Sequence, residues 1–263
     1  MTINPEQIPG CTVEPGFKIF EKNHLLTAGE TDSRGLMPVQ LIASRVIEAA
    51  TDHSNLLGIG YADLAKLNLR WVLVRLSIEV DRSLAINESY KIATWIESVN
   101  RFFSDRGSMI TDKDEKIVAR IHSVWAAIDN DTRLLGNLEQ LPKDGFTIVE
   151  PKFKLDKLAP PAIDINSEIA ERTLKFGVTD IDFNRHVNAI RYLTAAIDSH
   201  DLRFYDSHSI GRLDASFEHE VYYGEEISVA SGTDANVNFA DTTVLTRPDG
   251  KRAAAIRLLW HNL

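Results

Sequence analysis

The chain has 263 residues, of which 44% are hydrophobic and 25% are charged, and its formal net charge is −9. These are ordinary values for a folded protein and exclude a disordered or fibrous chain, while the acidic balance disfavours nucleic acid and anionic membranes as partners. The longest apolar runs, such as residues 71–74, are far shorter than the ~18 residues that a membrane-spanning helix needs, so no membrane span is expected.

The first ten residues contain two prolines, one glutamate and no lysine or arginine, so they lack the basic and apolar regions of a secretory signal. We therefore expect the protein to be cytoplasmic. Cys11 is the only cysteine, which excludes an intrachain disulfide and any metal site with two thiolates, and we expect it to lie in an unstructured leader. No glycine-rich phosphate loop is found, and His208, His219 and His261 lack the spacing of a metal site, so neither cofactor nor metal is expected.

The first predicted element is a helix that begins near residue 39, after Thr-Asp and a polar turn at residues 31–38. Its apolar face is formed by Val39, Ile42, Ala43 and Val46. Residues 71–80 predict a half-buried strand, because apolar side chains stand at every second position. Residues 111–129 predict a hairpin with a polar turn.

The second half repeats this order of elements. Thr-Asp and a polar turn at residues 179–188 precede a helix, and the chain ends with a hairpin at residues 246–263. The predicted helix face is formed by Val187, Ile190, Leu193 and Ile197. In each terminal hairpin a tryptophan, Trp125 or Trp260, follows the leading lysine by nine positions. We interpret the two halves as a duplication; chance similarity between short apolar hairpins is the alternative.

A long helix followed by antiparallel strands predicts an α+β fold, in which each half wraps its sheet around one long helix. We place the amino-terminal domain at residues 1–150, a linker at 151–166 and the carboxy-terminal domain at 167–263. Pro160 and Pro161 stiffen the linker and prevent regular structure there.

The densest polar segment, TDIDFNRHVN at residues 179–188, directly precedes the second helix. Asp182, Asn184 and His186 alternate there, and in an extended segment their side chains would lie on one side, next to the unpaired N–H groups of a helix N-terminus that can bind an oxyanion. The alternative is that the Asp and Asn residues form turns and caps and that the histidine is a surface residue. The matching first-half turn contains neither a histidine nor a second acid.

This segment resembles the D-x-N-x-H-V-N motif of the acyl-acyl carrier protein thioesterases of plants and bacteria. Asp182, Asn184, His186 and Asn188 fill the motif. The resemblance continues at SFEHEVYYGEEISV, residues 216–229, where Glu220 matches the glutamate of the family, and it covers most of the chain from about Phe17. It implies a tandem hotdog fold, with the catalytic residues in the second domain and the substrate pocket in the first.

The resemblance further implies a hydrolase that releases fatty acids from acyl carrier protein (ACP). The Asn184 region and the helix N-terminus would polarise the thioester carbonyl, His186 and Glu220 would position and deprotonate water, and Asp182 would orient the network. Plant members often have a cysteine after this glutamate, but here the residue is Val221, which leaves direct water attack or a carboxyl anhydride. Alternation along residues 213–221 puts Glu220 on a polar face that would ordinarily be solvated, unless a bulge turns it toward the helix.

The implied partner is an acyl carrier protein, which is acidic, so docking would require local positive charge. Candidate residues are Lys152, Lys154, Lys157, Arg185 and Arg191. Met37, Leu41 and Val46 could line an acyl pocket or belong to the core. The alternatives are a hotdog acyl-coenzyme A thioesterase, a hydroxyacyl dehydratase and a non-catalytic acyl-binding module. Dimerisation beyond the tandem pair is left open.

Overall fold

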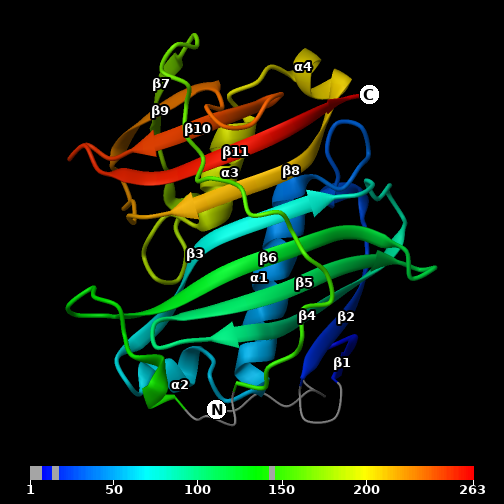
Figure 1. Ribbon diagram of the computed structural model, residues 1–263, viewed down its shortest axis with the longest axis vertical. Helices are drawn as coiled ribbons and strands as arrows, with labels where there is room; N and C mark the ends of the chain where they lie inside the picture. Colours follow the sequence, from blue (N-terminus) through cyan, green and yellow to red (C-terminus); the bar gives the residue numbers. More distant parts are fainter. Residues whose placement is uncertain (1–7, 14–17, 142–145) are drawn as a thin grey trace. The chain divides into compact units, whose positions relative to one another are not determined.

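The computed structural model describes residues 8–13, 18–141 and 146–263. The chain divides into two compact units, the first made of Met1–Val74 and Val80–Leu155 and the second of Arg75–Glu79 and Asp156–Leu263. Each unit combines antiparallel strands with a helix on one face of them (Figure 1), so the predicted α+β class is confirmed. No helix in the described ranges is long and apolar enough to cross a membrane.

The first unit begins with a short hairpin and then follows the predicted order of helix and strands. Its elements are β1 (Cys11–Val13), β2 (Ile19–Leu25), η2 (Ala28–Glu30), α1 (Val39–Leu56), α2 (Tyr61–Ala65), β3 (Leu69–Val80), β4 (Ser89–Val99), β5 (Phe103–Asp112), β6 (Ile117–Asp129) and η3 (Leu138–Gln140). The strand order is β1-β2-β4-β5-β6-β3, and α1 packs against β4 and β2. The predicted strand at 71–80 is therefore β3, and the predicted hairpin at 111–129 is formed by β5 and β6.

Helix α1 buries the face that its sequence predicts. Val39, Ile42, Ala43 and Val46 are all buried, and the same stripe continues through Ala49 and Ala50. The helix ends at Leu56, and Gly58 follows it with a positive φ of 70°, a conformation that glycine adopts without steric cost.

The second unit has the same plan with a shorter helix. Its elements are the β3 stretch Arg75–Glu79, β7 (Ala170–Lys175), η5 (Val178–Asp180), α3 (Ala189–Ile197), α4 (Leu202–Ser207), β8 (His208–Phe217), β9 (Glu226–Thr233), β10 (Ala240–Thr246) and β11 (Arg252–Asn262). The Arg75–Glu79 stretch pairs with β8, followed in order by β11, β10, β9 and β7. All of these neighbours are antiparallel.

The prediction of a second long helix is wrong in length. α3 has only nine residues, so Val187 precedes it, although Leu193 and Ile197 are buried as expected. α3 ends at Ile197, where Asp198 is the C-cap residue, and the Asp201 carboxylate accepts a hydrogen bond from the Phe204 N–H at 2.7 Å and caps the next helix, α4.

The two terminal hairpins close in the same way, which supports the duplication. Asp112 N–H donates to the Lys116 carbonyl and Arg247 N–H to the Lys251 carbonyl, both at 2.9 Å. The residue before each lysine has a positive φ, 60° at Glu115 and 81° at Gly250. The same turn therefore joins β5 to β6 and β10 to β11.

Cys11 does not lie in an unstructured leader. It forms strand β1 and pairs with Lys22 in the antiparallel β1–β2 ladder. Because part of the thiol is buried, its pKa is raised, which disfavours the reactive thiolate.

Two buried arginines attach the residues after position 155 to the second unit. Arg212 donates to the Asp156 carbonyl at 2.7 Å, and Arg257 donates to the Ala159 carbonyl at 3.0 Å. Arg257 is 0% exposed and pairs with Asp234, whose carboxylate oxygen is 2.9 Å from its Nε. These contacts give the proline-containing segment a fixed course although it has neither helix nor strand.

Candidate functional site

The polar segment before α3 folds into a tight turn between Asp182 and His186. The Asp182 carboxylate accepts backbone hydrogen bonds from Asn184 at 2.8 Å and from His186 at 3.3 Å. Asp182 N–H also donates to the His186 carbonyl, and Arg185 has a positive φ of 69°. The segment is therefore not the extended approach that the alternation predicts; its aspartate shapes the turn, as aspartates commonly do.

This turn brings His186 to Glu220. His186 Nδ1 lies 3.2 Å from Glu220 Oε1, and the histidine is only 9% exposed. The two loops are joined along the backbone, because His186 forms a β-bridge with Tyr222 and Val187 N–H donates to the Val221 carbonyl at 2.9 Å. The predicted convergence of imidazole and carboxylate is therefore found.

Glu220 reaches this position because strand β8 ends at Phe217. The alternation that would place it on a solvated strand face stops there, since the N–H groups of Glu218 and His219 both donate to the Ala253 carbonyl. Asp214, on that supposed solvated face, is buried and pairs with Arg212 at 2.9 Å. The row is therefore solvated only in part, since Asp214 is buried whereas Glu218 is exposed.

Asn184 lies within the turn, half-buried and two residues before His186, and its N–H donates to Asp182. Asn188 occupies the N-cap of α3, where its side chain accepts a hydrogen bond from the Ile190 N–H at 2.9 Å. Of the four residues that match the family motif, Asp182 forms the turn and Asn188 caps the helix. The other two are His186 and Asn184, which lies in the same turn.

Three further residues support the pair and were not singled out from the sequence. The Tyr192 hydroxyl accepts a hydrogen bond from the Val221 N–H at 3.2 Å, and burial raises the pKa of this tyrosine, which keeps it neutral. The Tyr222 ring packs edge-on against the His186 ring, with centroids 5.0 Å apart. Arg247 lies over the Tyr222 ring and pairs with Glu225 at 2.8 Å. In the sequence, the one signal of these contacts is the pair of aromatic residues, Tyr222 and Tyr223, that closely follows Glu220.

The first unit has the same turn without the chemistry. The Asp32 carboxylate accepts the N–H groups of Arg34 at 2.9 Å and Leu36 at 3.0 Å, and Leu36 forms a β-bridge with Ala85. Leu36 is equivalent to His186, because each forms the β-bridge after the turn, with Ala85 and Tyr222 respectively. Ser83 is equivalent to Glu220, because each lies two residues before that bridge partner. The first unit therefore has no histidine and no carboxylate at these two positions.

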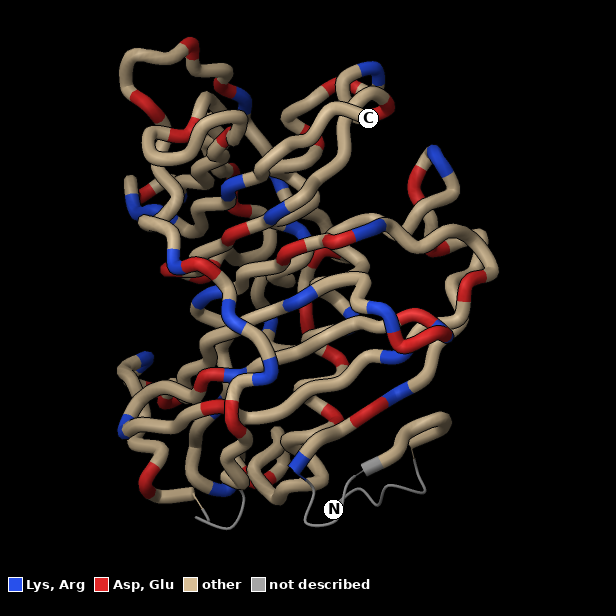
Figure 2. Tube along the Cα trace, turned by 45° about the vertical axis from the view of Figure 1, so that its right-hand side comes forward, with Lys and Arg blue, Asp and Glu red and all other residues tan. Residues whose placement is uncertain are grey.

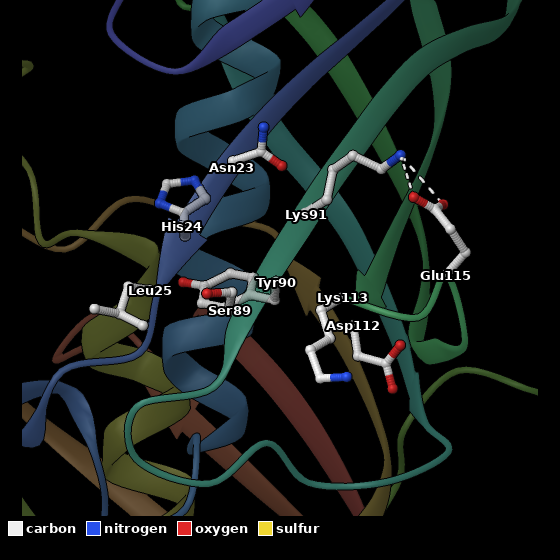
Figure 3. Close-up of a pocket in the computed structure, with 9 residues that line it drawn as sticks. All are labelled: Asn23, His24, Leu25, Ser89, Tyr90, Lys91, Asp112, Lys113 and Glu115. Atoms are coloured by element: carbon white, nitrogen blue, oxygen red, sulfur yellow. Dashed lines mark hydrogen bonds and ion pairs between the residues drawn. The ribbon is translucent and has the colours of Figure 1, made fainter.

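A surface groove of about 380 Å³ lies in the first unit (Figure 3). Its lining residues are Asn23, His24, Leu25, Ser89, Tyr90, Lys91, Asp112, Lys113 and Glu115. The His24 and Tyr90 rings are stacked with centroids 5.2 Å apart, and Lys91 pairs with Glu115 at 3.1 Å. The groove contains none of the residues predicted for the site, and its two lysines and two acids balance in charge.

The candidate pocket and docking residues have ordinary surroundings. Met37 and Val46 are buried in the first unit and Leu41 is half-buried. Basic and acidic positions are interspersed along the trace (Figure 2). Lys152 lies over the Trp95 ring at 5.5 Å, and Arg191 pairs with Asp180 at 3.1 Å. In the described part of the chain, no three His, Cys, Asp or Glu side chains gather in a way that could hold a metal ion.

Comparison with protein families gives two adjoining matches. The acyl-ACP thioesterase N-terminal domain matches residues 17–142, and the acyl-ACP thioesterase C-terminal domain matches residues 164–262. A chloroplastic palmitoyl-acyl carrier protein thioesterase of Gossypium hirsutum is 25% identical in an alignment of 236 residues that covers 84% of this chain and 56% of that protein. A chloroplastic oleoyl-acyl carrier protein thioesterase of Coriandrum sativum is 24% identical over 94% of this chain and 70% of its own length. The chain thus spans just over half of the cotton protein.

Solved structures agree over almost the whole chain. An acyl-ACP thioesterase from Bacteroides thetaiotaomicron has a TM-score of 0.82 and 26% identity, covering 92% of this chain and 98% of its own. The 12:0-ACP thioesterase from Umbellularia californica has a TM-score of 0.78 with 18% identity, covering 93% of this chain and 98% of its own, a likeness of fold. The tandem hotdog fold predicted from the sequence is confirmed.

Proposed function

Because the chain belongs to the acyl-ACP thioesterase family, we propose that it hydrolyses fatty acyl-ACP and releases a free fatty acid. The observation that carries the proposal is the 3.2 Å contact between His186 Nδ1 and Glu220 Oε1 beside the start of α3. An imidazole that is oriented by a carboxylate is a recurring general base, and it needs no covalent nucleophile.

In the proposed reaction Glu220 accepts a hydrogen bond from the Nδ1–H group of His186 and so fixes the tautomer in which Nε2 is basic. Nε2 then removes a proton from water as the water oxygen attacks the thioester carbonyl carbon. The developing oxyanion is stabilised by Asn184 and by the N–H groups at the α3 N-terminus. Asp182 acts through the backbone, because its carboxylate holds the N–H groups of Asn184 and His186.

The leaving group requires little help from the protein. A thiol has a pKa of about 8.5, whereas water has one near 16, so the pantetheine thiolate can depart from the tetrahedral intermediate without prior protonation. A base and an oxyanion site are therefore sufficient for the whole cycle, in which water adds to the carbonyl carbon, the carbon–sulfur bond breaks, and the proton held at His186 Nε2 passes to the released thiolate.

Water attack is preferred here over a carboxyl anhydride because both Glu220 oxygens have hydrogen-bonding neighbours. Oε1 faces His186 Nδ1 at 3.2 Å, and Oε2 lies 3.4 Å from the Tyr222 hydroxyl. A carboxylate held in this way is oriented as an acceptor. A single turnover in ¹⁸O-labelled water tests this preference: direct attack puts the label into the fatty acid and leaves Glu220 unlabelled, whereas an anhydride opened at the Glu220 carbonyl carbon puts the label into Glu220 and an unlabelled Glu220 oxygen into the fatty acid.

The test of the function is thiol release from acyl-ACP by the wild type and by His186→Ala. We expect release by the wild type and its loss in the variant. Release from acyl-coenzyme A alone would favour the acyl-coenzyme A thioesterase, and conversion of hydroxyacyl to enoyl chains without thiol release would favour the dehydratase. Binding of acyl-ACP without turnover would leave only the acyl-binding module.

The proposed carrier protein is acidic, so we further propose that exposed basic residues guide its docking. Lys154, Lys157 and Arg185 are the better candidates, because Lys152 contacts Trp95 and Arg191 is paired with Asp180. Reversing these three charges is expected to raise KM and to weaken its dependence on salt, while kcat is retained. A cytoplasmic location and a homodimer stay proposals, to be tested by cell fractionation and by light scattering.

A further inference from the structure

Tyr222 contacts both members of the proposed acid–base pair. Its ring meets the His186 ring edge-on, with centroids 5.0 Å apart and an interplanar angle of 78°. Its hydroxyl lies 3.4 Å from Glu220 Oε2, the oxygen that does not face the imidazole. The backbone of Tyr222 also forms a β-bridge with that of His186. One side chain thus touches the ring of the base and the far oxygen of the carboxylate.

The ring of Tyr222 is itself held in place from the other direction. The Arg247 guanidinium carbon lies 5.6 Å from the ring centroid, within the range of a cation–π contact. Arg247 pairs with Glu225 at 2.8 Å, and the Glu225 carboxylate accepts the Tyr222 N–H at 2.9 Å. Burial acts to raise the pKa of Glu225, but these two partners outweigh it and the pKa is lowered, so the glutamate stays charged. Arg247 and Glu225 therefore brace both the ring and the backbone of Tyr222.

The first unit shows that the turn itself does not need this tyrosine. Ala85 occupies the corresponding place, forms the β-bridge with Leu36 and donates its N–H to Glu88 at 3.0 Å. Residues two positions further along have matching positive φ angles, 68° at Asn87 and 81° at Gly224. The backbone is thus reproduced with a methyl group in place of the aromatic ring.

The arginine also differs between the units. In the first unit Glu88 is held by Arg82 at 2.9 Å, and Asp112 stands at the hairpin position that Arg247 occupies in the second. In the second unit the bridge residue is Tyr222, Arg247 lies over its ring, and its neighbours are His186 and Glu220. In the first unit the bridge residue is Ala85, and Leu36 and Ser83 take the places of His186 and Glu220. The ring and its arginine accompany the acid–base pair rather than the fold.

We propose that Tyr222 is a positioning residue for His186 and Glu220, and that Arg247 holds it in that role; the inference rests on the proposed thioester hydrolysis. Hydrogen bonding from the Tyr222 hydroxyl to Oε2 fixes the plane of the carboxylate while Oε1 accepts a hydrogen bond from Nδ1–H of His186. Ring packing limits rotation of the imidazole about its side-chain bonds. Both effects act on the chemical step and leave substrate binding unchanged.

The experiment measures kcat and KM for thiol release from acyl-ACP with Tyr222→Phe, Tyr222→Ala and Arg247→Gln. We expect Tyr222→Phe to lower kcat about threefold to tenfold, since a long hydrogen bond to a charged group is at the weak end of its class, and Tyr222→Ala about tenfold to 100-fold. KM should stay within about twofold for both, and Arg247→Gln should fall between them. Tyr223, the next residue and 64% exposed, provides the matched control as Tyr223→Ala.

A second readout is independent of turnover. Long-range ¹H–¹⁵N spectra of the His186 ring report its tautomer, and we expect one tautomer in the wild type and in Tyr223→Ala but a mixture in Tyr222→Ala. Thermal unfolding verifies that the variants are folded, as Ala85 in the equivalent turn leads us to expect. Wild-type kcat and an unchanged His186 spectrum in Tyr222→Ala would overturn the inference. Absence of thiol release by the wild type would refute the hydrolase instead, and the spectrum alone would then decide the role of Tyr222.

Discussion

Asp32 and Asp182 make the same pair of hydrogen bonds at the same point of the two repeats. Each carboxylate accepts the N–H groups two and four residues further along, at 2.9 and 3.0 Å for Asp32 and at 2.8 and 3.3 Å for Asp182. In one repeat the second N–H belongs to Leu36 and in the other to His186. The aspartate is therefore a turn former in both repeats, and the role proposed for Asp182 in catalysis acts through the backbone of the histidine.

This pair provides a matched test of Asp182. Asp182→Ala and Asp32→Ala are both expected to destabilise the fold by about 1–2 kcal/mol, because each leaves turn N–H groups without their acceptor. Only Asp182→Ala should also lower kcat for thiol release, by about tenfold, since only its turn contains the base. Urea unfolding and steady-state kinetics measure the two effects. An equal loss of activity in both variants would show that the loss reflects stability alone.

The first unit also indicates which substitutions the turn tolerates at the active pair. His186→Leu and Glu220→Ser introduce the residues that stand at the equivalent positions, Leu36 and Ser83, so both variants should fold. We expect each to lower kcat by about 10²–10⁴, the range of general acid–base catalysis. The double variant should lose little more than the worse single variant, because the two groups act as a unit. Losses that multiply in the double variant would mean that the residues act independently.

Cys11 is expected to have no part in the reaction. It lies in strand β1 of the first unit, burial raises the pKa of its thiol, and the residue after Glu220 is Val221, which is 0% exposed. Cys11→Ser should therefore keep wild-type kcat and KM, and iodoacetamide should leave the wild type active. Inactivation by iodoacetamide that Cys11→Ser prevents would reinstate a thiol in the mechanism.

Acid stability should depend on Asp112, in the first hairpin. Arg82 donates to its carboxylate at 2.8 Å and lowers its pKa to about 2, below the ordinary value of about 3.9 expected in the unfolded chain. Its contribution to the free energy of unfolding is therefore complete above about pH 4 and is lost as the pH falls toward 2. The difference between the wild type and Asp112→Asn, measured by urea unfolding, should shrink over that interval. Asp114→Asn, in the same turn but exposed, is the control, and a constant difference for Asp112→Asn would contradict the assignment.

The fold and the contact between His186 and Glu220 could be predicted because both depend on local patterns. The helix face from Val39 to Val46 follows a spacing of three and four residues, and the paired hairpins repeat their turns and tryptophans at the same offset. His186 and Glu220 each lie in a short motif with family precedent. In these places the neighbours along the chain determine the structure.

The errors arise where a few polar groups or distant partners decide. The Asp201 side chain caps a separate helix, α4, shortly after α3 ends, and the Ala253 carbonyl accepts two successive N–H groups at the end of β8, so that Glu220 leaves the alternation. Arg247 and Tyr222 are 25 positions apart and meet only through the packing of a loop against a hairpin. No periodicity in the sequence encodes such a contact, which is why Tyr222 was not singled out.

The carbonyls of Asp156 and Ala159, bound by Arg212 and Arg257, determine where such proteins can be recombined. Consider a chimera that joins the amino-terminal part of one relative to the carboxy-terminal part of another at residue 163. Its residues 156–159 and its two buried arginines would come from different proteins, so the arginines could lose their carbonyl acceptors. A crossover placed just before residue 156 would transfer the whole segment together with its arginines. The crossover position that preserves the hydrogen bonds of both buried arginines thus lies before Asp156, and the two prolines of the segment do not indicate it.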